Sequence, residues 1–147
     1  MSRQRSQARA HAVQALYQWQ VTGDNVVDII KQFRDANPDS DFDLLYFSQL
    51  LSGVTGNLSR LDAQLAPYLD RAINSVDLVE RAILRLGVYE LLERPEIPYK
   101  VVINESVELA KTYGADQGHK YINGLLDKVA QQVRAVEIKA GGGRRRS

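Results

Sequence analysis

The chain has 147 residues, of which 44% are hydrophobic and 25% are charged, and its formal net charge is +1 at pH 7. This length can bury one hydrophobic core, and no segment reaches the roughly 20 uncharged apolar residues of a membrane span. The absence of cysteine excludes disulfides, thiolate metal sites and cysteine nucleophiles. Because the N-terminal segment lacks the apolar stretch of a secretory signal, we expect a cytoplasmic protein with no membrane partner.

Basic residues cluster at the two ends of the chain. No acidic residue precedes Asp24, whereas three arginines lie within the first nine positions. Three glycines precede Arg144–Arg146 at the other end, a composition typical of a flexible charged segment. We therefore expect one helical domain over residues 1–137 and a flexible basic tail over residues 138–147.

Apolar residues recur three and four positions apart along the chain, a spacing typical of helices and not of strands. The first predicted helix covers about residues 6–21 and ends at Gly23. A second, short helix begins near Val26 and ends before the polar loop at residues 37–40.

A long third helix is predicted to begin after Asp41, which is a suitable N-cap, and to continue to Leu65. Pro67 ends it, because proline cannot donate the backbone hydrogen bond that a helix interior needs. Gly53 and Gly56 weaken this helix in its middle.

Three further helices follow. Ser75 is a suitable N-cap for a helix over residues 76–93, whose segment AILRLGVYELL is apolar on nearly all sides and so belongs at the centre of a bundle. Pro98 suits the first turn of a fifth helix that ends at Gly114, and a sixth helix runs from about 116 to 136. The sequence thus predicts an all-α fold, a compact bundle of about six main helices.

Catalytic groups are sparse. The two imidazoles, His11 and His119, are remote in sequence, and Asp116 near His119 is better explained as a helix-surface pair. No Gly-rich phosphate loop, GxSxG turn, HExxH motif or pair of Glu-x-x-His motifs is present. We expect no enzyme, no metal and no other cofactor.

The first helix carries a pattern that favours RNA binding. Arg5, Arg9, Val13 and Tyr17 are four residues apart and form a stripe that runs from cations to an aromatic ring. Cations neutralise phosphates, and an exposed ring can stack an unpaired base. On spacing alone an alternative is equally good, in which Val13 and Tyr17 widen the core face and the arginines face water.

A second segment, Gly118-His119-Lys120-Tyr121, offers comparable chemistry in the sixth helix. Glycine permits a close backbone approach, and Lys120 and Tyr121 offer charge and stacking. Because Tyr121 is adjacent to Ile122, its ring could equally belong to the core.

Several segments together resemble a known family. AVQALYQWQ, LYF, LLSGV, ERAILRLGVYEL, PYKVVINESVELAK and GHKYINGLLDKV occur in the order found in NusB antitermination factors, and the resemblance runs from about Arg5 to Lys128. It implies an all-helical fold of two packed three-helix groups, which agrees with the six helices predicted from periodicity.

The resemblance also implies a function. NusB proteins bind the single-stranded boxA element of ribosomal RNA leader transcripts together with NusE, a small-subunit ribosomal protein, and the pair helps RNA polymerase pass terminators. By this similarity the RNA-binding residues of the chain are Arg5, Arg9, Tyr17, Gly118, His119, Lys120 and Tyr121. The partner-binding residues implied are Glu80, with Arg81 and Arg85 as its neighbours.

Other interpretations remain beside this one. A related domain precedes the catalytic domain of ribosomal RNA cytosine-5 methyltransferases, but this chain is too short for that enzyme and lacks its cysteine nucleophile. A helical protein-interaction module without specific RNA binding would also fit. The sequence leaves open a homodimer, and whether Arg85 and Glu90 serve the fold or a partner.

Overall fold

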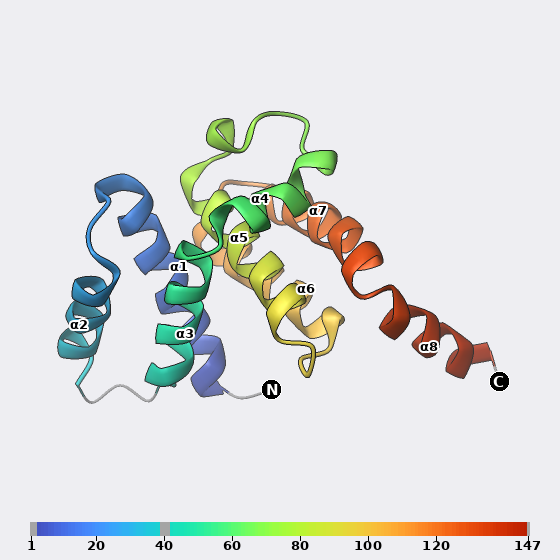
Figure 1. Cartoon of the computed structure of the whole chain (residues 1–147), viewed down its shortest axis with the longest axis horizontal. Coiled ribbons are helices and arrows are strands. Elements are labelled where there is room, and N and C mark those ends of the chain that lie inside the picture. Colours follow the sequence, from blue (N-terminus) through green and yellow to red (C-terminus); the bar gives the residue numbers. More distant parts are fainter. Residues whose placement is uncertain (1–2, 39–41, 147) are drawn as a thin grey trace.

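The computed structural model of the chain describes residues 3–38 and 42–146, with side chains as far as Gly141. All regular structure in these residues is helical (Figure 1), which confirms the predicted all-α class. None of the helices described is both long and apolar enough to cross a membrane.

Two groups of three helices pack together (Figure 1). The first group contains α1 (Arg3–Thr22), α2 (Val26–Ala36) and α3 (Leu44–Thr55). The second contains α5 (Leu78–Glu93), α6 (Tyr99–Tyr113) and α7 (Gly118–Val133). The remaining elements are α4 (Leu58–Leu65), the 3-10 turns Ala66–Tyr68 and Ile73–Ser75, and α8 (Ala135–Arg146). The two groups meet where α1 and α3 pack against α5, which confirms the arrangement that the resemblance implied.

The prediction of one long third helix is wrong, because this segment is divided into two helices, α3 and α4. The side chain of Asn57 donates to the carbonyl of Gly53 at 2.7 Å, so it occupies the acceptor that its own backbone N–H would use in a continuous helix. That N–H instead donates to the carbonyl of Val54. The helix therefore breaks near the predicted weak glycines, Gly53 and Gly56, because the Asn57 side chain competes with its own backbone N–H for the Gly53 carbonyl.

Two helix starts differ from the predictions. Asp43 caps α3 by accepting a hydrogen bond from the N–H of Tyr46, whereas the predicted cap, Asp41, lies outside the described residues. Asp77, and not Ser75, caps α5, since its carboxylate accepts from two N–H groups in the first turn of that helix. Aspartate has both the side-chain acceptor and the negative charge that a helix N-terminus favours.

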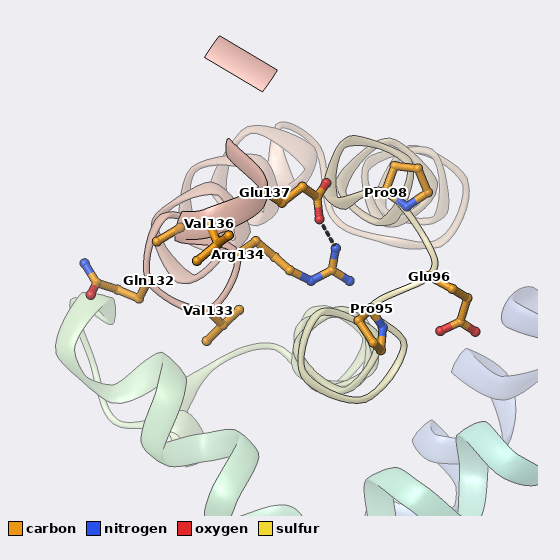
Figure 2. Close-up of a pocket in the computed structure, with 9 residues that line it drawn as sticks. Pro95, Glu96, Pro98, Gln132, Val133, Arg134, Val136 and Glu137 are labelled. Atoms are coloured by element: carbon orange, nitrogen blue, oxygen red, sulfur yellow. Dashed lines mark hydrogen bonds and ion pairs between the residues drawn. The ribbon is translucent and has the colours of Figure 1, made fainter. Parts of the chain in front are cut away.

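The sixth predicted helix ends early, at Val133, and α8 begins two residues later. The buried guanidinium of Arg134 donates to the carbonyls of Leu91 and Ile97 at 2.8 and 2.9 Å. It also pairs with Glu137 (Figure 2). It thus satisfies carbonyls at the end of α5 and in the loop after it. A hollow of about 620 Å³ lies beside this junction.

The helix α8 extends away from the bundle (Figure 1). It includes residues 138–146 of the segment that was expected to be a flexible tail. The side chains of Arg144–Arg146 lie outside the described residues.

A buried ion pair lies where the two groups meet. The guanidinium of Arg9 in α1 donates through Nε and Nη2 to the carboxylate of Glu90 in α5, at 2.9 Å for the shortest contacts, and both side chains are 1% exposed. Arg9 also donates to Glu105 of α6 at 3.0 Å, and the hydroxyl of Tyr46 in α3 donates to Glu90. Four helices are therefore joined by one polar cluster, Arg9–Tyr46–Glu90–Glu105.

Burial alone would lower the pKa of Arg9, but the hydrogen bonds and charge of Glu90 outweigh burial, so the pKa is raised. Burial and the nearby carboxylate of Glu90 raise the pKa of Tyr46, which keeps its hydroxyl protonated as a donor. The Arg9 guanidinium therefore stays charged, and the Tyr46 hydroxyl stays protonated, within the cluster.

We predict that Glu90→Gln lowers the free energy of unfolding by about 3 kcal/mol, because it leaves the buried charge of Arg9 poorly compensated. Glu93→Gln, on the same helix but in an exposed pair with Arg60, should cost less than about 1 kcal/mol. Urea unfolding of both variants measures the difference. Equal losses would show that the buried pair has no special role in stability.

Candidate nucleic-acid interface

The stripe predicted on α1 is not a continuous surface. Tyr17 is 42% exposed, but Val13 is 2% exposed and belongs to the core. Arg9 is turned inward onto Glu90, so its expected contact with RNA is corrected to a role inside the fold. Residues spaced four apart lie on the same side of a helix. In α1 the middle of that side is covered by the neighbouring helices α3, α5 and α6.

Arg5 lies on a different part of the surface from Tyr17. The two positions are twelve residues apart in sequence, which corresponds to about 18 Å along a helix. The Arg5 guanidinium carbon is 4.5 Å from the centre of the Tyr46 ring, and that of Arg94 is 4.9 Å from the same centre. Cations over an aromatic ring are held by the electron density of its face. Arg5 and Arg94 therefore both lie against the Tyr46 ring, and Arg94 also pairs with Glu96 at 3.0 Å.

The start of α7 packs on the start of α5. A Cβ at Gly118 would lie 2.7 Å from Oε2 of Glu80, so any side chain here would force the buried Glu80 carboxylate to move. The preceding residue, Gln117, has a left-handed backbone with φ +66°, a conformation that L-residues rarely adopt. The turn into α7 thus combines a close helix contact at Gly118 with a strained backbone at Gln117.

The other residues of the predicted RNA segment point in different directions. Lys120 is exposed, whereas His119 and Tyr121 are half-buried. The Tyr121 hydroxyl donates to Asp70 at 3.3 Å, and the guanidinium of Arg71 lies 5.5 Å from the centre of its ring. Burial, followed by the charge of Asp70, raises the pKa of Tyr121. Lys120 is therefore the open cation of this segment.

The predicted partner residues face largely inward. Glu80 is 8% exposed and lies beneath Gly118, so the structure brings a predicted partner residue against a predicted RNA residue. Arg85 is also buried and donates to both oxygens of Asp62 at 2.9 Å, which fastens α5 to α4. Arg81 donates to the carbonyls of residues 74 and 76. The structure gives Arg85 and Glu90, whose roles the sequence left open, partners within the fold.

A pocket connects Tyr17 with the start of α5. It has a volume of about 270 Å³ and is lined by Val13, Gln14, Tyr17, Val79 and Tyr113. Val79 is next to Glu80, which touches Gly118, so Tyr17 and the start of α7 both lie against the start of α5. Tyr113 was not predicted from the sequence as a site residue. The signal that could have identified it is an aromatic residue that lies outside the core stripe of its helix, directly before Gly114.

The described residues contain no group of three or more side chains placed to hold a metal ion. His11 lies among aromatic rings, 4.6 Å between centres from Phe42 and 6.0 Å from Phe33. Burial lowers the pKa of His11, as expected for a neutral ring packed in an apolar cluster.

Gly118→Ala is expected to lower the free energy of unfolding by about 1–3 kcal/mol, because the new methyl group would overlap the Glu80 carboxylate. Gly124→Ala is the matched control on the same helix, since a Cβ there meets nothing within 4 Å. It should stabilise the protein by about 0.5–1 kcal/mol through helix propensity. Opposite shifts in the urea midpoint support the contact, and a stabilising Gly118→Ala would contradict it.

Comparison with known proteins identifies the family. Residues 6–131 match the NusB family. The chain is 54% identical to the transcription antitermination protein NusB of Nitrosococcus oceani over 148 residues, which cover 99% of this chain and 98% of that protein. It is 49% identical over 138 residues to the protein of the same name from Xanthomonas axonopodis pv. citri, covering 94% of this chain and 87% of that protein.

Solved structures show the same fold. NusB of T. maritima is 32% identical, with a TM-score of 0.77 over 90% of this chain and 94% of that one. A crystal structure of the antitermination factors NusB and NusE in complex with dsRNA contains a chain that is 28% identical, with a TM-score of 0.81 over 89% of this chain and 98% of that one. Since sequence and structure agree along most of its length, the chain belongs to the NusB family.

Proposed function

We propose that this chain is a transcription antitermination factor that binds the boxA element of ribosomal RNA leader transcripts together with NusE. One structural observation carries the proposal: the two predicted RNA segments meet at the start of α5. Tyr17 lines a pocket with Val79, and the start of α7, which carries the exposed Lys120, packs on the next residue, Glu80. The similarity to a chain crystallised with NusE and dsRNA supports the choice of RNA and partner.

Each group has a defined part in this proposal. Tyr17 stacks an unpaired base, and Lys120 neutralises a phosphate. Arg5, held over the Tyr46 ring, neutralises a phosphate farther along the strand. Gly118 lets the start of α7 pack closely on α5, and Arg9 contributes by holding α1 in place.

The partner surface is proposed beside the start of α5. Glu80 and Arg81 are the residues from the predicted set that we assign to NusE, with Arg85 supporting α5 through Asp62. The chain would then act in the antitermination complex of RNA polymerase, in the cytoplasm and without catalytic activity of its own. A homodimer is a further proposed state, in which a second copy covers the face that binds RNA.

We predict that Tyr17→Ala combined with Lys120→Ala lowers the affinity for boxA RNA by about 10- to 100-fold, the loss expected for one stacked base and one phosphate contact. The measurement is fluorescence anisotropy with boxA RNA and a scrambled RNA at fixed salt, with and without NusE. Lys31→Ala, which removes an exposed cation on α2, is the control.

The natural chain should prefer boxA to the scrambled RNA, and NusE should strengthen this preference. The double variant should lose it while Lys31→Ala keeps it. Equal binding of both RNAs by the natural chain, with no effect of NusE, would contradict the proposal and favour a helical protein-interaction module.

A further inference from the structure

The pocket beside Tyr17 has the lining of a site for a flat, uncharged ring. Its walls are the rings of Tyr17 and Tyr113, which are 42% and 40% exposed, and its apolar lining includes Val13 and Val79. Among the side chains that the structure describes, no charged one lines it. Half-exposed aromatic rings of this kind are platforms on which unpaired bases stack.

The size of the pocket limits its occupant. Pockets that enclose drug-sized ligands have volumes of roughly 300–1,000 Å³, so a pocket of about 270 Å³ suits a single ring system. A helix or strand of a protein partner would require a longer groove. The dimensions therefore favour one base of a single strand over a protein segment.

Polar groups near the pocket also indicate how it is used. The amide of Gln14 donates to the hydroxyl of Tyr113 at 3.4 Å, a long hydrogen bond that links α1 to the end of α6. Next to it is a second hollow of about 150 Å³, which shares Tyr113 but is lined by the charged residues Arg9, Glu105 and Glu108. The uncharged pocket beside Tyr17 is therefore the better of the two for an uncharged base.

We propose that the pocket lined by Tyr17, Tyr113 and Val79 receives one unpaired base of the bound RNA, with Tyr113 as a base-binding residue. This inference rests on the proposed function, because it requires that the chain bind single-stranded RNA. It adds that one nucleotide is turned into the protein, while its neighbours contact the surface cations.

The test is a scan of boxA RNAs that each lack the base at one position. In the natural chain, removal of the inserted base should lower affinity by about 5- to 100-fold, the range for one stacked base. In Tyr113→Leu, intact RNA should bind correspondingly more weakly, and removal of that base should have little further effect. Tyr113→Phe should recover the base dependence, because it keeps the ring and lacks only the hydroxyl.

Two further variants sharpen this test. In Tyr17→Leu, the base whose removal no longer lowers affinity must be the same base as in Tyr113→Leu, because both rings line one pocket. Tyr99→Leu, at the other end of α6 and about 21 Å away along the helix, should leave the scan unchanged. Thermal unfolding of each variant checks that it is folded.

The outcomes separate the two proposals. No preference for intact boxA over scrambled RNA in the natural chain would overturn the proposed function and this inference with it. A clear preference, but no position whose cost depends on Tyr113, would overturn the base pocket alone. A Tyr113→Leu variant that loses affinity for NusE and keeps its affinity for RNA would assign the pocket to the protein partner instead.

Discussion

The ion pair between Arg9 and Glu90 joins the two three-helix groups and fixes the rotation of α1 about its axis. It thereby determines which side chains of α1 face solvent. Two charges removed from water are tolerated only when each has its partner in good geometry, and here both oxygens of Glu90 accept from Arg9 while Tyr46 adds a third donor. Glu105 completes the cluster from α6. Because the four side chains come from four helices, α1 cannot rotate about its axis without leaving a buried charge unpaired.

That constraint determines which side chains remain available for binding. With Arg9 and Val13 turned inward, Tyr17 emerges at the far end of α1, beside Val79 and Tyr113. The Gly118–Glu80 contact brings the start of α7 to the same region. The proposed RNA surface is thus assembled from both helix groups, so its shape depends on an ion pair that does not itself touch RNA.

Periodicity in the sequence predicted the helices well, since burial of an apolar stripe is a local property of the pattern. It did not predict the break between α3 and α4, which depends on the amide of Asn57 taking the Gly53 carbonyl. Nor could spacing place Arg9, because its partner is 81 residues away and only the packed helices bring the two together. Tyr113 was missed for a similar reason: the residues that make its pocket come from α1 and α5.

The most direct test of this account is the RNA affinity of Arg9→Met combined with Glu90→Gln, compared with Arg9→Met alone. The single variant leaves Glu90 buried without its cation, and it should lose stability and RNA affinity together. The double variant removes both charges, and its amide oxygen still accepts from Tyr46, so both stability and boxA affinity should recover. Recovery of stability while RNA affinity stays lost would contradict the account, because Arg9 would then be a direct contact to RNA.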